Sequence, residues 1–459
     1  MADALKALVN IISTETNHLL LVYAAQNTEF LSLNATSGPI TCSNPGPALD
    51  LDPALIRSRQ LIVAAATQLI ATVRPPAEFL QDAVSAMLKP AALRVIIDTN
   101  IPEVLSEEGP QGLHVNDLSV RTGVDESYLA RVMRYLATRH IFRELTPNVF
   151  THNRISTLLS KNKSVKDLKA DPIGKWDNSP FTSTRTDEIF TSSVHFSAYL
   201  REPDQSLAPF NMGHNTSKKL WEWYEEQGNE WRLRRFTAAM KANGNMYPPH
   251  IFTSVFDEEA LRPGDVVVDV GGNVGTVTLV LKKAFPKLRY VVQDLEKLMP
   301  AGEQYWNEND PEASNSGQVV LQAHNFFDQQ PVKHAAVYFL RLILHDWPDN
   351  DAREILLNLR DAAAPSSKLV IFESLARYTC DDPSLDLSAS APFPLLANLG
   401  EAGEGFGTAL DLVMLTLFNG KERTLDDFVR LGKESGWKLE RMKPGILSAL
   451  IFTPADSAS

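Results

Sequence analysis

The spacing of apolar residues changes along the chain and predicts three successive regions. Residues 1–55 are weakly patterned and end in a loop rich in Pro, Ser, Gly and Asn, from Ser37 to Asp52. Over residues 56–245 the apolar positions recur mostly at helical spacing, which predicts a mostly helical domain. Over residues 246–459 short β-branched runs alternate with helical segments, as is typical of an α/β domain built on a parallel sheet. We therefore expect an N-terminal extension followed by two domains of different class.

Residues 91–155 have the pattern of a winged helix-turn-helix within the helical domain. The elements expected in order are a helix over 91–105, a second helix opening at Leu113, a tight turn at 122–124, a helix capped by Asp125, and two wing strands at 142–145 and 148–151. The helix after the turn has one apolar face, formed by Leu129, Val132, Met133 and Leu136. We expect this face to pack in the core of the block.

A winged helix-turn-helix serves either DNA binding or packing and dimerisation. The helix after the turn carries Asp125 and Glu126 against Arg131 and Arg134, so it brings no net positive charge to a groove. The whole chain has 44 basic and 56 acidic residues, a net charge of −12, which repels phosphate backbones. We therefore predict a scaffold or dimerisation module with no nucleic-acid partner.

Composition predicts a soluble cytoplasmic protein with no membrane partner. The 459 residues are 44% hydrophobic and 22% charged, as in ordinary globular proteins. Two cysteines, Cys42 and Cys380, cannot build a disulfide framework and suggest a reducing compartment. No apolar run approaches the roughly 18 residues that span a bilayer, and the longest, Leu61 to Ala71, predicts a buried helix. The first residues lack the basic-then-apolar order of a signal peptide.

The α/β domain is expected to hold five parallel strands and a reversed terminal hairpin. The parallel strands are expected at Val266–Val270, Arg289–Gln293, Val319–Gln322, Ala336–Leu340 and Lys368–Phe372. The antiparallel hairpin is expected at Trp437–Met442 and Leu447–Thr453. This order is more specific than a generic doubly wound sheet. It indicates the Rossmann-like sheet of class I methyltransferases.

A glycine-rich turn follows the first of these strands and predicts a ligand site. A dinucleotide fingerprint would need glycine at position 270, where this chain has valine, so a nicotinamide cofactor is disfavoured. Asp269 stands ahead of Gly271 and Gly275, which suits a ligand with an ammonium group. Asp294, about 20 residues further on, is placed to accept hydrogen bonds from ribose hydroxyls. S-adenosylmethionine has both groups and no phosphate, and a plain strand-to-helix connection is the alternative.

His345 and Asp346 follow the fourth strand, at the strand ends where open α/β sheets bind ligands. An imidazole with its ordinary pKa of about 6.5 is the natural general base near neutral pH. A phenol titrates near 10, so full deprotonation beforehand costs roughly 5 kcal/mol, and removal during methyl transfer is favoured. Two alternatives remain: the start of the next helix with Asp349 as N-cap, and a metal site built from the carboxylates around His345.

Two acids recur after later strands and complete the candidate catalytic group. Glu373 ends the strand at 368–372, and Glu422 lies in the segment Asn419-Gly-Lys-Glu-Arg-Thr. A carboxylate beside His345 would fix its tautomer and stabilise the imidazolium that forms. From spacing alone, either acid could equally be a surface residue.

Taken in order, these motifs resemble the caffeic-acid-type S-adenosylmethionine-dependent O-methyltransferases, especially the fungal branch of secondary metabolism. The resemblance covers about residues 55–455 and rests on the winged-helix block, DVGGNVG, QDL, NFF, LRLILHDWPD, IFES and FNGKERT. It implies a small-molecule substrate, a hydroxyl of an aromatic or polyketide-type metabolite, with no metal. It also implies a homodimer, in which the winged-helix domain serves dimerisation and closes over the substrate.

Carried over residue by residue, the resemblance implies roles for ten positions. The glycines lining the cofactor loop would be Gly271, Gly272 and Gly275. Other cofactor contacts would be Asp294 at the ribose, Asn325 and Phe326 at the adenine, and Arg341 in the place of a cofactor-contacting Lys or Arg. The catalytic base would be His345, flanked by Glu373 and Glu422.

Three departures from the family pattern stand out. Asn273 replaces a frequent glycine, which asparagine tolerates because it visits left-handed conformations. Asn325 replaces an aspartate, which removes a charged acceptor beside the adenine. The connection from 377 to 407 is long and rich in Pro, Ser and Gly, which predicts a lid or a disordered insert. Some similar proteins act as pericyclases or dehydratases with the cofactor as a bound cation, and this reaction class remains an alternative.

Overall fold

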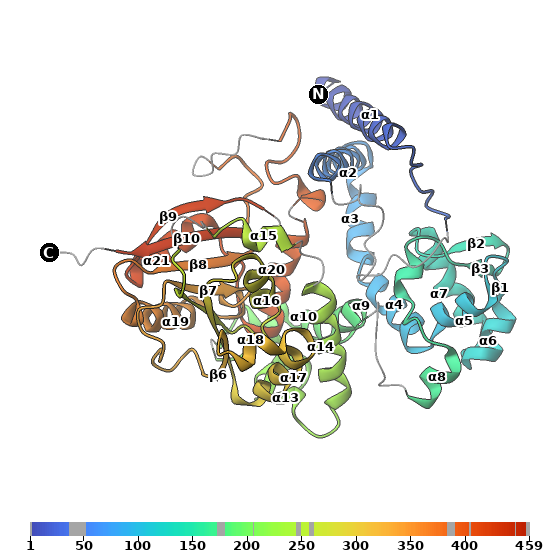
Figure 1. Ribbon diagram of the computed structural model, residues 1–459. Helices are drawn as coiled ribbons and strands as arrows, with labels where there is room; N and C mark the ends of the chain where they lie inside the picture. The colour runs from blue at the N-terminus through green and yellow to red at the C-terminus, as the bar shows by residue number, and fades with distance from the viewer. Residues whose placement is uncertain are drawn as a thin grey trace. The chain divides into compact units, whose positions relative to one another are not determined.

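The computed structural model divides into two compact units (Figure 1). Unit 1 comprises Met1–Met246 and Ala389–Gly405, and unit 2 comprises Tyr247–Ser388 and Phe406–Ser459. The structure describes residues 2–35, 52–171, 180–204, 206–244, 249–256, 261–382, 391–403, 405–445 and 447–455. Cys42 and most of the loop expected from Ser37 to Asp52 lie outside the described residues. Within them, no helix is long and apolar enough to cross a membrane.

Unit 1 opens with two helices that pack on each other, α1 (Ala2–Ala25) and α2 (Pro53–Val73). Their contact buries Leu19, Tyr23 and Leu55. The weak apolar pattern of the first 55 residues gave no sign of α1, because its helix buries only a few side chains. The predicted buried helix from Leu61 to Ala71 is wrong in one respect: it belongs to α2, but the side chains of Val63 and Ile70 are exposed.

The single helix predicted over residues 91–105 is wrong, because the structure has two helices there. They are α4 (Leu88–Asp98) and α5 (Ile101–Glu108), preceded by α3 (Pro76–Ser85). Asn100 separates them with a φ of 56°, a left-handed conformation that asparagine adopts more readily than most residues. Pro102 then lies in the first turn of α5, where its missing N–H costs no helical hydrogen bond.

The tight turn, the helix capped by Asp125 and the two predicted wing strands are confirmed, but the second helix does not open at Leu113, because Leu113–His114 is a third strand of the wing and the helix begins at Val115. Gly123, with a φ of 75°, ends α6 (Val115–Thr122), and Asp125 caps α7 (Glu126–Thr138) by accepting a 2.9 Å hydrogen bond from the Ser127 amide. The wing is an antiparallel sheet of order β1-β3-β2, with the strands Leu113–His114, Val149–Thr151 and Arg143–Thr146. On the predicted apolar face of α7, three side chains are buried and one is half-buried: Leu129, Met133 and Leu136, and then Val132.

The remainder of unit 1 is a series of short helices and one longer helix. In chain order they are η2 (Ser156–Leu159), α8 (Val165–Ala170), α9 (Pro180–Thr184), the π-helical η3 (Arg185–Ile189), α10 (Phe190–Ser193), α11 (Phe196–Tyr199), α12 (Pro209–Gly213), α13 (Leu220–Tyr224), α14 (Glu230–Gly244) and η6 (Gly400–Ala402). A buried ion cluster ties α14 to η3, because Arg235 pairs there with Asp187 and Glu188. Part of the predicted 377–407 insert thus belongs to unit 1, where Leu399 packs against α2.

Unit 2 is built on a seven-stranded sheet of order β6-β5-β4-β7-β8-β10-β9. The strands β4 to β8 are parallel, and β10 runs antiparallel to both β8 and β9. Every end lies within one residue of its prediction: β4 Val266–Val270, β5 Arg289–Asp294, β6 Val319–Ala323, β7 Val337–Arg341, β8 Lys368–Glu373, β9 Trp437–Lys443 and β10 Ser448–Pro454. The predicted class I methyltransferase sheet with its reversed terminal hairpin is confirmed.

Helices cover both faces of this sheet and bury an apolar core on each (Figure 1). Alternate residues of β7 point to opposite cores, with Phe339 on one side and Leu340 on the other. The helices of unit 2 are α15 (Pro249–Thr253), α16 (Thr276–Ala284), η4 (Glu296–Leu298), α17 (Met299–Asn309), α18 (Pro311–Asn315), η5 (Leu344–Asp346), α19 (Asp349–Ala362), α20 (Gly405–Phe418) and α21 (Leu425–Glu434). Because β4 to β8 are parallel, their carboxyl ends share one edge of the sheet.

Candidate active site

The turn after β4 adopts the backbone geometry that the glycine pattern predicts. Gly271 and Gly275 have φ angles of 70° and 85°, in the left-handed region where a Cβ is unfavourable. Asn273 has a φ of 53°, so the expectation that asparagine tolerates this position is confirmed. The turn therefore brings the backbone between β4 and α16 to the carboxyl edge of the sheet.

Neighbouring side chains also explain why these positions are glycine. A Cβ on Gly272 would lie 2.5 Å from the carboxyl carbon of Asp269, and one on Gly275 would lie 2.9 Å from Nε1 of Trp306. A Cβ on Gly271 would lie 2.6 Å from Cδ1 of Ile343, on the turn after β7. The loop is thus packed against the ends of its own strand and of the neighbouring strand.

A buried carboxylate, Asp269, and a half-buried one, Asp294, lie on either side of this turn. Asp269 accepts a 2.6 Å hydrogen bond from the Thr278 hydroxyl on α16, and its burial raises the pKa of the carboxyl to about 6. Asp294 ends β5, and its two oxygens accept 2.8 Å hydrogen bonds from the amides of Asn273 and Leu295. Burial raises the pKa of Asp294 as well. The carboxylate of Asp294 is therefore held directly against the glycine turn.

The other predicted cofactor residues lie at the ends of β6 and β7. Phe326 follows β6, and its ring lies beside Gly271, with Cε1 only 3.7 Å from where a Cβ there would stand. Asn325 turns back on its own chain, since its side-chain oxygen accepts a 3.2 Å hydrogen bond from the Phe327 amide. Arg341 ends β7, with its guanidinium 5.8 Å from the ring centre of Phe252.

The three predicted catalytic residues come together from three separate segments. His345 lies in η5, just past β7, and its Nδ1 is 2.7 Å from Oε1 of Glu422. Glu373, at the end of β8, accepts hydrogen bonds of 3.0 and 2.9 Å from the amides of Ile343 and Leu344, and its other oxygen is 3.8 Å from Nδ1. All three side chains are buried. One carboxylate therefore touches the imidazole directly, and the other holds the turn that carries it.

The carboxylates around His345 change its acid–base behaviour. Burial alone would lower the pKa of the imidazole, but Glu373, Asp346 and Glu422 outweigh it and raise the pKa of His345 to about 10. Burial in turn raises the pKa of Glu373 to about 7 and that of Asp346 to about 6. An imidazole with its ordinary pKa was expected here, whereas the structure favours an imidazolium near neutral pH.

The structure tests the helix start predicted after His345 and, for the metal alternative, brings together a different set of residues. Asp349 is the first residue of α19 rather than its N-cap, so that expectation is wrong: Pro348 takes the cap, and the Asp349 carboxylate pairs with Arg423 and Arg430. A different trio, His345, Glu373 and Glu422, offers one ligand atom each within 4.8 Å of one another. Within the described part of the chain, these three residues have the donor types that could hold a cation.

A family comparison identifies the domains that carry these features. A model of the O-methyltransferase domain matches residues 195–438, more than half of the chain. The chain belongs to the O-methyltransferase family. A model of the O-methyltransferase dimerisation domain matches residues 81–162, which include the winged helix. The protein is therefore an O-methyltransferase that depends on S-adenosyl-L-methionine.

Similar proteins come from fungi. An O-methyltransferase of Armillaria gallica is 36% identical over 96% of this chain and 96% of its own. A 4-O-methyltransferase of Phanerochaete chrysosporium is also 36% identical, over 84% of this chain and 85% of its own.

Solved structures share the fold at lower identity. OxaC, in complex with sinefungin and meleagrin, has a TM-score of 0.67 and 21% identity and covers 99% of both chains. A structure described as a pericyclic reaction enzyme has a TM-score of 0.63 and 19% identity, covering 89% of this chain and 99% of its own.

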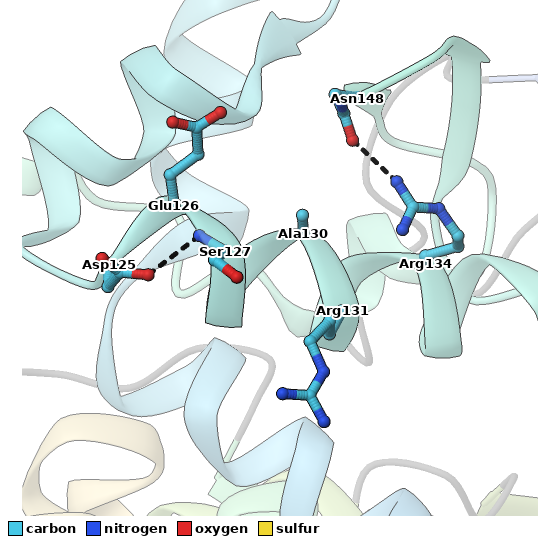
Figure 2. Close-up of a pocket in the computed structure, with 7 residues that line it drawn as sticks. All are labelled: Asp125, Glu126, Ser127, Ala130, Arg131, Arg134 and Asn148. Carbon is cyan, nitrogen blue, oxygen red and sulfur yellow. Dashed lines mark hydrogen bonds between the residues drawn. The ribbon is translucent and has the colours of Figure 1, made fainter.

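A separate pocket lies in unit 1, at the start of α7 (Figure 2). It is an open depression of about 560 Å³, lined by Asp125, Glu126, Ser127, Ala130, Arg131, Arg134 and Asn148. Its two acids and two arginines balance in charge, and Arg134 donates a 2.7 Å hydrogen bond to the Asn148 side chain (Figure 2). The balance agrees with the sequence argument against DNA binding, and none of the predicted cofactor or catalytic residues lines this pocket.

Proposed function

We propose that this enzyme methylates a hydroxyl, most naturally a phenol, of an aromatic or polyketide-type secondary metabolite, with His345 as general base. The observation that carries the proposal is the 2.7 Å pair between His345 and Glu422 beside the end of β7. When bound, S-adenosyl-L-methionine supplies an electrophilic methyl group on a sulfonium sulfur. The enzyme's residues then orient the acceptor hydroxyl and remove its proton.

The charges around the glycine turn fit this cofactor. Asp294 supports a ribose contact, since each of its oxygens accepts one backbone hydrogen bond and keeps a further lone pair. Asp269 places a carboxylate beside the turn, where an ammonium group is favoured and a pyrophosphate is not. We assign the cofactor contacts to these residues and to those already predicted: Gly271, Gly272, Gly275, Asn325, Phe326 and Arg341.

His345 accepts the phenolic proton at Nε2 while Nδ1–H donates to Glu422. Glu422 thereby fixes the tautomer and stabilises the imidazolium, and Glu373 holds the turn through two amides. A pKa of about 10 on His345 matches that of a phenol, which titrates near 10. Once His345 is neutral, proton transfer from the phenol is therefore close to thermoneutral, whereas an imidazole of ordinary pKa would face a cost of roughly 5 kcal/mol.

The raised pKa of His345 predicts that kcat/KM increases with pH. His345 accepts a proton only when neutral, and below its pKa of about 10 the neutral fraction grows tenfold with each pH unit. A complex of phenolate with the His345 imidazolium has as many protons as a complex of phenol with neutral His345. If that complex is the reactive one, kcat/KM rises with pH at the same slope. Glu422→Gln removes an anionic partner, lowers the pKa of His345 and moves the rising limb to lower pH. Initial rates from about pH 6 to pH 9 test this expectation.

Glu440→Gln is the matched control for that pH profile, because Glu440 is an exposed residue of β9 that pairs with Lys368. Its profile should coincide with that of the wild type. A wild-type profile that is flat over this range, or a rising limb unmoved in Glu422→Gln, would contradict the role given to the raised pKa.

Paired acceptors test the proposed reaction itself. Each pair consists of a phenolic polyketide and its own methyl ether, incubated with S-adenosylmethionine and enzyme. S-adenosylhomocysteine and the methylated product should form only with the free phenol. Equal S-adenosylhomocysteine from both members of every pair would reject the hydroxyl as the acceptor.

A pericyclase or dehydratase reaction is the second candidate, because a pericyclic reaction enzyme shares this fold. In that reaction the cofactor serves as a bound cation and no methyl is transferred. The buried His345–Glu422 pair favours methyl transfer, since it provides a base for a hydroxyl. Conversion of a polyketide without change of mass and without S-adenosylhomocysteine would decide for the second candidate.

We further propose that the enzyme is a homodimer assembled through the N-terminal helices. No residue of α3 is buried, and Phe79, Leu80 and Val84 expose much of their apolar side chains. This helix runs directly into the match to the dimerisation domain, which begins at residue 81. A partner copy that covers α3 would account for an apolar face on a helix that buries nothing.

The double variant Leu80→Asp, Val84→Asp should convert the dimer to monomers. Both side chains are 65–69% exposed, so the aspartates are tolerated in the monomer but unpaired in the interface. Light scattering after size exclusion measures the mass. Val194→Asp, at a valine 67% exposed and outside the dimerisation match, is the control and should stay dimeric. A wild-type monomer, or a variant that remains dimeric, would refute the assignment.

A further inference from the structure

Arg423, next to Glu422, is one of the most deeply buried charged residues in unit 2, with 1% of its surface exposed. Its guanidinium donates a 2.6 Å hydrogen bond to the carbonyl of Leu344 and a 2.8 Å hydrogen bond to the carbonyl of Trp347. A third donor, Nε, is 2.9 Å from Asp349 at the start of α19. The two carbonyls lie on either side of His345, so the planar fork of the arginine spans the turn that carries the imidazole.

The backbone around Arg423 binds the other catalytic segments. Arg423 forms a β-bridge with Leu375, and its carbonyl accepts a 3.0 Å hydrogen bond from the Ala376 amide, just after Glu373. On its other side, the Lys421 amide donates a 2.8 Å hydrogen bond to the carbonyl of His345. This one segment therefore contacts the chain on both sides of the catalytic group.

Gly420 shows how closely that segment approaches the turn. A Cβ at this position would overlap the carbonyl oxygen of His345 and lie 2.9 Å from the carbonyl carbon of Asp346. Both are backbone atoms and cannot rotate away as a side chain can. The approach is therefore fixed by the backbone, and Arg423 acts on a turn that has little room to shift.

Burying a guanidinium carries a large desolvation free energy, which good hydrogen bonds must offset. Here the fork meets two carbonyls and one carboxylate, the kind of geometry that a lysine ammonium reproduces poorly. Asp349 supplies the counter-charge and also binds Arg430, which is 46% exposed. The buried guanidinium therefore orients the backbone carbonyls of the turn that carries His345.

We propose that Arg423 is a positioning residue for methyl transfer, whose guanidinium holds the His345 turn so that the imidazole stays against Glu422. It touches neither the reacting atoms nor the cofactor residues in the described structure and acts through His345. The proposal rests on the proposed general-base role of His345. It adds that the geometry of the base depends on an arginine behind it.

Arg423→Lys keeps the charge and removes the fork, so it tests orientation rather than electrostatics. We expect kcat to fall by roughly 10- to 100-fold, because misplacing a reacting group slows the reaction by about this factor. The KM for S-adenosylmethionine should stay within about twofold of the wild-type value. Titration of the His345 imidazole by nuclear magnetic resonance should show its pKa displaced toward the ordinary value, since the contact with Glu422 loosens.

Arg430→Gln is the matched control, because Arg430 binds the same Asp349 without touching the catalytic turn. Its kcat and its imidazole titration should match the wild type. Asp349→Asn is the second variant: it removes the counter-charge of Arg423 and leaves the fork. It should show a smaller shift in the same direction even if Arg423→Lys folds poorly, which thermal unfolding and S-adenosylhomocysteine binding would reveal.

Unchanged kcat and an unchanged His345 titration in Arg423→Lys would overturn the proposal. So would equal losses in Arg430→Gln and Asp349→Asn, which would indicate a general effect of the ion network. The titration needs no turnover, so it separates this proposal from the proposed function. If the wild type methylates no acceptor while Arg423→Lys still displaces the His345 titration, the positioning role stands and only the proposed reaction fails.

Discussion

Replacing His345 with asparagine is expected to lower kcat by roughly 10²- to 10⁴-fold, the range that a general base contributes. Asparagine keeps a donor near the position of Nδ1, so the contact with Glu422 can persist while the titratable base is lost. Affinity for S-adenosylhomocysteine should stay within about twofold, since His345 is not among the groups assigned to the cofactor. Steady-state rates together with calorimetric binding measure both quantities.

His334→Asn provides the control for this variant. His334 is exposed on the loop before β7, and its φ of 57° is one that asparagine accepts. Its activity should equal that of the wild type. If His345→Asn retained wild-type kcat, the base would have to be another group or solvent, and the enzyme would act by positioning alone.

The second large effect is expected from Gly272→Ala in the cofactor loop. The new Cβ would stand 2.5 to 2.9 Å from the carboxylate atoms of Asp269, which must then leave the Thr278 hydroxyl. Leaving a buried polar group without its partner costs about 1–3 kcal/mol. If the displaced carboxylate is the one that binds the cofactor ammonium, a contact of similar size is lost in the complex, which corresponds to roughly a 5- to 160-fold weaker affinity for S-adenosylmethionine.

Gly302→Ala is the matched control because this glycine lies inside α17, where the new Cβ would meet only the end of the Leu321 side chain, at 3.1 Å. Alanine favours the helix by about 1 kcal/mol over glycine, so stability should hold or rise and affinity should not change. Unaltered cofactor affinity in Gly272→Ala, with the fold intact, would remove Asp269 and this turn from the cofactor site.

The strands and the glycine turn of unit 2 were predicted well, because the residue patterns that mark them lie within short stretches of sequence. The parallel strands contain short apolar runs, β9 alternates apolar with charged residues, and positive φ at Gly271 and Gly275 follows from the glycine pattern. The break at Asn100 was missed for the opposite reason. The apolar spacing continues across residues 91–105, and only the pairing of Asn100 with Pro102 signals that the helix stops.

The raised pKa of His345 could not be predicted from the sequence. The carboxylates that raise the pKa of His345 come from Asp346, Glu373 and Glu422, and Glu422 lies 77 residues away. Their combined effect depends on burial and distance, which only the folded chain sets. The same holds for Arg423: the motif FNGKERT contains it, but its fork over the His345 turn depends on carbonyls that no residue pattern marks.

The most direct test of the account is a single-turnover reaction with S-adenosylmethionine that carries an isotopically labelled methyl group. Enzyme in excess, a phenolic acceptor and the labelled donor are mixed, and labelled product and S-adenosylhomocysteine are quantified together over time. The account predicts that both form at the same rate in equal amounts, with the label on the acceptor oxygen, and that both collapse in His345→Asn. Acceptor conversion without label or S-adenosylhomocysteine would contradict it.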